Sequence, residues 1–472
     1  MTETAKITTQ NERRSALEKF FEGRLYPFLI AAAVLFGHIT ALEFYVAIPM
    51  LIFASVAFLV CRTVKPFIPL ALSFVYLVNI EHAPGVPTWS DYYKSTYIIL
   101  TAIALFTLLL GCAIYFAAKN IVPKFKIRSA PLLFPLLLLS AAFLLNGAFS
   151  GRWNIASLAY GAAQAAVFFL CFYLFYYGLK GEDTKKLLDY ISYVALLVGM
   201  VIVIELANMF MTSDVIINKW GVIVKDNINL GWGISNPIGF SLIILIPLLM
   251  RGAIVSRARI VYLLAPLIVS FAAFITLSRN AILFGALTLL ATFIIALVKS
   301  KSRWPYITVV ITGAVLGGAI LFKYLEDIKW ILHELMLSGV RDSGRFKNWN
   351  ACIENFKLSP LFGIGFFSWG EIDHFSAANF LPNMAHNTVF QLLSSMGIVG
   401  LVSYAIYRIC SLVPFMKKLT FDKIMVLLPI LITIGTSLLD NFMFYFYTTF
   451  IYEIMLAIAF NIRDKEKEYE NL

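Results

Sequence analysis

The sequence predicts an all-α, polytopic transmembrane helical bundle of roughly 12 to 14 spans, with a large, partly helical extracytoplasmic loop. Of the 472 residues, 60% are hydrophobic and 14% are charged, whereas a soluble domain is about half apolar and a quarter charged. The apolar residues also form blocks of roughly 15 to 24, the length that crosses a hydrocarbon core as a helix. A soluble fold could not bury so much apolar surface.

Candidate spans follow one another along the whole chain, some of them short. They are Tyr26–Ile39, Leu42–Val60, Phe67–Ile80, Thr96–Ala118, Pro131–Asn146, Ile155–Gly178, Leu187–Phe210, Ile238–Met250, Ile260–Leu277, Ala281–Val298, Tyr306–Phe322, His386–Tyr407, Ile424–Leu439 and Phe442–Phe460.

Basic residues orient these spans, because short loops rich in Lys and Arg stay in the cytoplasm. Alternate loops carry the positive charge, which places 27 of the 38 Lys and Arg residues on the side of both termini. The predicted order is a cytoplasmic tail (1–24), a transmembrane bundle (25–322), an extracytoplasmic loop (323–385), further transmembrane helices (386–461) and a second cytoplasmic tail (462–472).

Other protein classes fit the composition less well. The net charge of +11 is spread over short runs between apolar blocks, so topology explains it better than nucleic-acid binding does. A polar tail precedes the first apolar block, unlike a signal peptide. The five cysteines stand singly, without metal or redox spacing, so a disulfide framework is not expected.

The loop 323–385 is too long for a simple connector. Apolar residues at helical spacing predict an interfacial helix over Tyr324–Leu337. A second helix is expected after the capping candidates Asp342 and Ser343, with Arg345 in its first turn and Pro360 beyond its end. Trp220, Trp232 and Lys225 in the outer loop 211–236 could contact sugars, but we leave them outside the predicted site.

Two arginines are candidate phosphate ligands. Arg279 lies between two apolar blocks at the predicted outer membrane boundary, where a charge usually faces a cavity or substrate pathway; a snorkelling helix-end arginine is the alternative. Arg345 offers a planar fork suited to phosphate oxygens. An ordinary exposed loop arginine is its alternative, and Arg341 and Lys347 are competing neighbours.

His386 is the candidate base. It stands where an apolar block begins, and a histidine can accept a proton from an attacking hydroxyl near neutral pH. The alternative is an interfacial histidine bonded to a carbonyl or to Asn387. Two cations and one base at the outer face would suit transfer from a lipid diphosphate. No His, Cys and Asp cluster predicts a metal site.

Three short motifs resemble the O-antigen ligase and O-antigen polymerase superfamily of membrane glycosyltransferases. They are Ser278-Arg279-Asn280, Ser343-Gly344-Arg345 followed by Pro360, and His386 followed by Gly397. The likeness covers roughly Ile260 to Tyr407. The ligases have twelve spans, whereas fourteen segments are apparent here, so the first short segments are open to revision.

The resemblance implies a metal-independent, inverting glycosyltransferase of the bacterial cytoplasmic membrane, with its site on the periplasmic side. Its expected partners are an undecaprenyl diphosphate-linked glycan, an acceptor glycan (lipid A core or a growing chain) and membrane lipid. His386 would be the base, Arg279 and Arg345 would hold the diphosphate, and Asn387 and Arg341 would also bind substrate. No cofactor is expected.

Two alternatives stay open. A polymerase of O-antigen, capsule or exopolysaccharide would carry the same motifs and differ in its acceptor. A transporter or flippase of lipid-linked glycans shares the composition, but it predicts inverted repeats and charges near the midplane. We find no repeat, and the candidate charges lie at one face.

Overall fold

The computed structural model describes residues 16–77, 95–213, 223–323, 345–366, 385–416 and 419–470. Apart from one isolated bridge between Asn229 and Ile234, the regular elements within these ranges are helices. The all-α prediction is therefore confirmed.

Helices coincide with the apolar segments named above, over the residues that the structure describes. The first half contains α2 (Ala16–Glu22), α3 (Leu25–Thr40), α4 (Glu43–Val60), α5 (Phe67–Ser73), α7 (Thr96–Asn120), α8 (Leu133–Phe149), α9 (Ile155–Ala166), α10 (Phe172–Gly178) and α11 (Thr184–Thr212). The second half contains α12 (Ser235–Ile243), α13 (Ile246–Val255), α14 (Arg259–Ile275), α15 (Arg279–Lys299), α16 (Trp304–Lys323), α18 (Arg345–Leu358), α19 (Thr388–Leu412), α20 (Phe421–Ser437) and α21 (Phe446–Glu470).

The chain is a multi-pass membrane protein, but the structure does not confirm 12 to 14 spans. Among the described residues, 7 helices are long and apolar enough to cross a membrane, or 8 if α2 and α3, which meet at 61°, form one span. Three further apolar helices, Phe67–Leu77, Leu133–Phe149 and Arg259–Ile275, have 10–17 residues. A straight helix of that length falls short of a hydrocarbon core of about 30 Å.

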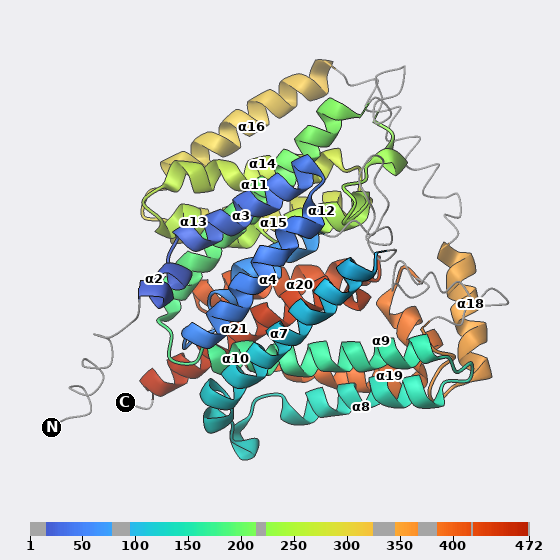
Figure 1. Ribbon diagram of the computed structural model, residues 1–472. Coiled ribbons are helices and arrows are strands. Elements are labelled where there is room, and N and C mark those ends of the chain that lie inside the picture. Colours follow the sequence, from blue (N-terminus) through green and yellow to red (C-terminus); the bar gives the residue numbers. More distant parts are fainter. Residues whose placement is uncertain are drawn as a thin grey trace.

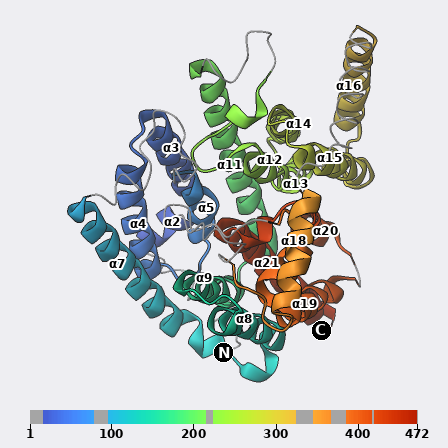
Figure 2. The ribbon, with the colours of Figure 1, turned by 90° about the vertical axis from the view of Figure 1, so that its right-hand side faces the viewer.

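The helices differ in how much of their surface other helices cover. The continuous apolar segment Ser235–Val255, formed by α12 and α13, is almost entirely buried, whereas most of α7 is exposed. Figure 2 shows α7 and α16 at the periphery. We therefore place α12 and α13 at the centre of the bundle and α7 against lipid.

The two predicted sides of the membrane correspond to opposite ends of the bundle. Figure 1 shows α2 and the end of α21 at the left and α18 at the right. At the end of the bundle that we expect to face the cytoplasm, three helices are joined by ion pairs. Buried Arg251 bonds Asp189 at 2.7 Å and Asp422 at 2.8 Å. These contacts link the start of α11, the body of α13 and the start of α20.

One predicted helix of the long loop is present. The helix expected after residue 343 is α18, and it ends before Pro360 as predicted. Its capping candidates Asp342 and Ser343, like the expected helix Tyr324–Leu337, lie outside the described residues.

A break in α19 holds the end of the long loop against the bundle. Gly397 has φ 64° and ψ −158° inside this helix, which frees the next amides from the helical ladder. The Ile398 amide donates to the Pro360 carbonyl at 2.8 Å, and the Val399 amide donates to the Leu361 carbonyl at 3.2 Å. A Cβ at Gly397 would lie 2.5 Å from both carbonyl oxygens. Pro360 and Gly397, which belong to two of the three sequence motifs, therefore meet at one contact. We call this contact between 360–361 and 397–399 the loop joint.

Replacing Gly397 with Ala should destabilise the protein by about 2 to 4 kcal/mol, because a left-handed conformation and a backbone clash are added together. The apparent melting temperature of the detergent-solubilised protein, followed by fluorescence-detected size exclusion, measures this effect. Gly111→Ala in α7 is the control, since a Cβ there meets nothing within 4 Å. Equal melting temperatures for both variants would contradict the joint.

Candidate active site

His386 lies outside helix α19, not within it as the apolar pattern suggested. Its φ of 53° is left-handed, and the helix begins at Thr388. Asn387 causes the difference, because its Oδ1 caps the helix by accepting from the amides of Val389 at 2.8 Å and Phe390 at 3.2 Å. Side-chain caps of this kind stabilise a helix by about 1 kcal/mol. The cap directs the chain so that the imidazole projects beyond the helix end.

Asn387 also joins α19 to the end of α20. Its Nδ2 donates to the Leu438 carbonyl at 2.8 Å, and the neighbouring Thr388 hydroxyl donates to the Ser437 carbonyl at 2.7 Å. Both polar atoms of the Asn387 side chain are therefore engaged within the protein. The structure gives this residue a role in positioning, and substrate contact by Asn387 stays a prediction.

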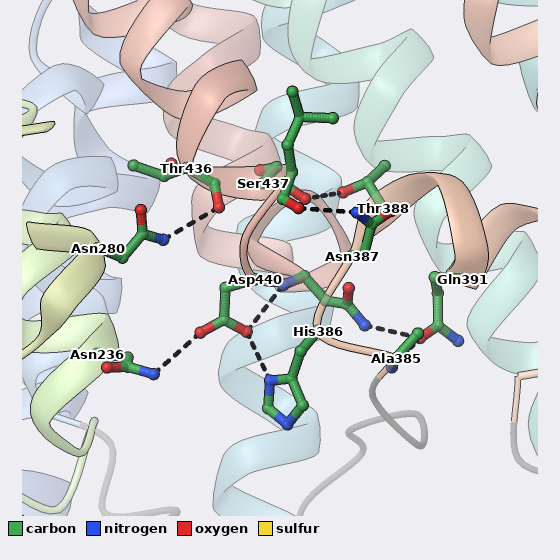
Figure 3. A network of polar contacts seen from close by, with 12 residues as sticks. Asn236, Asn280, Ala385, His386, Asn387, Thr388, Gln391, Thr436, Ser437 and Asp440 are labelled. Carbon is green, nitrogen blue, oxygen red and sulfur yellow. Dashed lines mark hydrogen bonds and ion pairs between the residues drawn. The ribbon is translucent and has the colours of Figure 1, made fainter. Parts of the chain in front are cut away.

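Asp440 is the partner of His386. Its Oδ1 lies 3.1 Å from His386 Nδ1 and also accepts from the Asn441 amide at 2.9 Å. Its Oδ2 accepts from Asn236 Nδ2 at 3.1 Å. Figure 3 shows the imidazole facing the Asp440 carboxylate. The Asp440 side chain is 6% exposed and that of His386 is 40% exposed. An ionised carboxylate only accepts, so this contact assigns the ring proton to Nδ1 and leaves Nε2 able to accept a proton.

A buried amide network fixes the turn that carries Asp440. Asn441 Nδ2 donates to Gln391 Oε1 at 2.7 Å, and the Ala385 amide donates to the same oxygen at 2.8 Å. Gln391 Nε2 in turn donates to the Ser395 hydroxyl at 2.8 Å. The residues before and after His386 are thus bonded to the turn between α20 and α21, which restricts the motion of the imidazole (Figure 3).

Arg279 is the first residue of α15. The Ser278 hydroxyl caps this helix by accepting from the Ala281 amide at 3.4 Å, and Asn280 Nδ2 donates to the Thr436 carbonyl at 3.1 Å. Ser278 and Asn280 are buried while Arg279 is exposed. Its guanidinium forms no ion pair with any residue that the structure describes. The motif Ser278-Arg279-Asn280 therefore buries its two outer members to anchor the arginine beside α20.

Arg345 is the first residue of α18, which rests on the start of α19. Trp349 Nε1 donates to the Ala385 carbonyl at 3.0 Å, and its ring stacks on Phe390 with centroids 5.1 Å apart. Near the end of α18, five residues before Pro360, Asn355 Nδ2 donates to the Ser394 hydroxyl at 3.2 Å. These contacts hold α18 beside His386. Arg341, the other predicted arginine, lies outside the described residues.

Lys225 is a third cation at this end of the bundle, in the short 3-10 turn η6 (Lys225–Asn227). Partial burial lowers the pKa of Lys225, and the charges of Arg279 and Arg345 lower it further, while Asp226 and Asp440 oppose this. Lys225 therefore lies within electrostatic range of both predicted arginines and of Asp440. The sequence analysis named Lys225 as a possible sugar contact but left it outside the site, because no spacing connects it to the two arginines or to His386.

The gathered charges favour an anionic ligand. Three cations from three separate segments repel one another, and a bound diphosphate would relieve that repulsion. The imidazole contacts Asp440, whose charge also acts on Lys225. With Nε2 available, a hydroxyl next to the anion could lose its proton there. Within the described ranges, no three His, Cys, Asp or Glu side chains are grouped to hold a metal ion.

Comparison with known protein families finds a match in the second half of the chain. Residues 263–405 match the family model described as O-antigen ligase, a segment from α14 to α19 that includes Arg279, Arg345, His386 and Gly397. No curated protein matches the chain. The match confirms the resemblance carried by the three motifs. Asp440, Asn236 and Lys225 lie outside the matched residues.

Removing the Arg279 charge should raise the pKa of Lys225, because a like charge that disfavours its protonated form disappears. At a fixed alkaline pH, a smaller fraction of Lys225 is then neutral, and acetylation by acetic anhydride slows. Mass spectrometry of full-length Arg279→Ala protein across pH 8 to 11 measures this change. Arg257→Ala, at an exposed loop residue before α14, is the control, and coincident Lys225 profiles for the two variants would contradict the cation cluster.

Proposed function

We propose that this chain, whose residues 263–405 match the O-antigen ligase family model, transfers a glycan from undecaprenyl diphosphate to an acceptor sugar at the outer face of the bacterial cytoplasmic membrane. The contact between His386 and Asp440, beside three cations, carries the proposal. It supplies a positioned base next to a place for a diphosphate. The acceptor that we propose is lipid A core, so the enzyme would be a ligase.

In the proposed reaction, the acceptor hydroxyl attacks the anomeric carbon of the donor sugar. His386 Nε2 takes the hydroxyl proton, and Asp440 stabilises the resulting imidazolium. The new bond to the acceptor oxygen forms as the bond between the anomeric carbon and the phosphate oxygen breaks. Undecaprenyl diphosphate leaves with that electron pair, and a single displacement inverts the anomeric centre.

The arginines stabilise the leaving group. Charge develops on the diphosphate as the glycosidic bond breaks, and fixed guanidinium groups interact with that charge more strongly than water does. Arg279 begins α15 and Arg345 begins α18, and in this proposal the two guanidinium groups neutralise the charge without a metal. Arg341 and Asn387 remain proposed substrate contacts.

The proposed topology follows from the function. A donor presented on the periplasmic side requires His386 on that side, and α2 and the end of α21, at the opposite end of the bundle (Figure 1), are then cytoplasmic. This orientation agrees with the loop charges. In this orientation the loop 323–385 is extracytoplasmic and the tails 1–24 and 462–472 are cytoplasmic, with transmembrane helices in 25–322 and 386–461. The count of 12 to 14 spans remains part of the proposal.

Transfer by purified protein tests the function. The protein in detergent is given an undecaprenyl diphosphate-linked oligosaccharide, with and without lipid A core, and product formation is followed by gel and mass spectrometry. Product on the core supports the ligase. A ladder from the oligosaccharide alone would identify a polymerase, and donor movement across proteoliposomes without any product would identify a transporter.

Substitutions test the residues. His386→Ala should lower the transfer rate by about 10²- to 10⁴-fold because the base is lost. Asp440→Asn should lower it by about 100-fold or more, because the amide carries no charge to stabilise the imidazolium and its NH2 group, if it faces Nδ1, selects the wrong ring tautomer. Arg279→Ala and Arg345→Ala should each lower the transfer rate by about 10²- to 10³-fold, because each removes a positive charge that stabilises the leaving diphosphate.

Arg257→Ala, outside the proposed site, should retain nearly full activity. All variants are compared at equal amounts of inserted, monodisperse protein. Loss of activity in Arg257→Ala equal to that in His386→Ala would refute the site.

A further inference from the structure

An apolar cavity of about 1000 Å³ lies between the first and the last helices of the chain. Its walls come from α4, α5, α7 and α10, and from the start of α21, together with Trp232 and Pro237. The volume is at the upper end of the range for small-molecule sites, which is about 300 to 1000 Å³. The cavity is therefore large enough for a sizeable ligand.

The lining restricts the class of ligand. Among its residues there is no Asp, Glu, Lys, Arg or His. The wall formed by α7 consists of residues such as Ile103, Phe106 and Leu110, which are also exposed at the surface of this peripheral helix. Sugars and phosphates need polar partners that such a wall lacks. A hydrocarbon chain matches the apolar lining, and it could enter from the bilayer because the wall formed by α7 lies at the periphery of the bundle (Figure 2).

One end of the cavity adjoins the candidate active site. Pro237 lines the cavity, and the preceding residue, Asn236, bonds Asp440. On the other side, Tyr445 lines the cavity five residues after Asp440. A ligand with a charged head among the cations and an apolar tail could therefore occupy both spaces at once.

Trp232 forms part of the cavity wall, together with Pro237. Its Nε1 donates to Glu205 Oε2 at 2.9 Å, and its ring meets the Tyr76 ring edge-on with centroids 4.5 Å apart. Gly231, with φ 83°, makes the tight turn that directs this side chain inward. Glu205 is fully buried within α11, and a carboxyl group inside a membrane span is costly enough to indicate a function.

We infer that this cavity binds the polyprenyl chain of the lipid donor, and that Glu205 positions Trp232 as the wall where the chain meets the diphosphate. The inference rests on the proposed function for the identity of the head group. It assigns Glu205 a positioning role in the binding of the lipid carrier. The N-terminal helices, which lie outside the matched family segment, thereby gain a role in donor binding.

Binding of two diphosphates tests the cavity without requiring turnover. Undecaprenyl diphosphate and geranyl diphosphate share a head group and differ in chain length, so the ratio of their dissociation constants reports chain binding. Full-length protein in detergent is titrated with each, and the unmodified protein should bind the long chain more tightly. Equal affinity for both, or displacement of the long chain by phosphatidylglycerol at the same concentration, would overturn the inference.

A matched pair of variants locates the binding. Leu109 lines the cavity, whereas its neighbour Leu108 on α7 faces outward and does not. Leu109→Trp should weaken undecaprenyl diphosphate binding at least about tenfold, since about two buried methylene groups contribute that much. The variant should leave the dissociation constant for geranyl diphosphate within about twofold of that of the unmodified protein. Leu108→Trp should change neither, and equal effects of the two variants would overturn the cavity assignment.

Glu205 is tested by rescue. Glu205→Gln keeps an acceptor for the Trp232 indole and should retain the preference for the long chain, measured as the ratio of the dissociation constant of geranyl diphosphate to that of undecaprenyl diphosphate. Glu205→Leu should lower this ratio while geranyl diphosphate still binds. A ratio unchanged in Glu205→Leu, or lowered equally in both variants, would overturn the role of Glu205. Normal chain-length dependence in a protein that transfers no glycan would refute the proposed function and leave the cavity assignment standing.

Discussion

The candidate site depends on one buried carboxylate, Asp440. It accepts from Asn236 at the start of α12 and from its own neighbour's amide, and it faces the imidazole of His386 before α19. Burying a charged group is costly unless donors surround it, so these contacts also fix the relative positions of three segments. The turn between α20 and α21 exists in this form because it must present Asp440 to its donors. The orientation of the imidazole is a consequence of that packing.

The outer loop reaches the same place through the break in α19. Gly397 releases two amides, which bond the carbonyls of Pro360 and Leu361, and α18 lies against the start of α19 with Arg345 as its first residue. Arg279 is the first residue of α15, next to the N-cap Ser278. Arg279 and Arg345 therefore each begin a helix, and His386 lies two residues before one. This arrangement lets a membrane bundle gather cations at one face without burying them in lipid.

The sequence predicted the apolar helices and the role of Pro360 as a helix stop, because each leaves a local signal at an apolar boundary. The roles of Arg279, Arg345 and His386 stay predictions. It did not predict Asp440, which stands alone after an apolar block and 54 positions from His386; only the fold brings the two together. Asn387 preceded a helix and could have been recognised as a cap. The span count stayed unconfirmed because hydropathy locates an apolar helix better than it measures whether the helix is long enough to cross.

In the proposed mechanism, binding and proton transfer belong to different residues: the cations hold the diphosphate, while His386 and Asp440 act on the acceptor. The affinity of purified protein for undecaprenyl diphosphate, measured in the His386→Ala and Arg279→Ala variants, tests this claim most directly. We expect His386→Ala to bind within about twofold of the unmodified protein and Arg279→Ala to bind at least about tenfold more weakly, because a charged hydrogen bond worth roughly 1.5 to 3 kcal/mol is lost. Equal weakening in both variants, or unchanged affinity in Arg279→Ala, would contradict it.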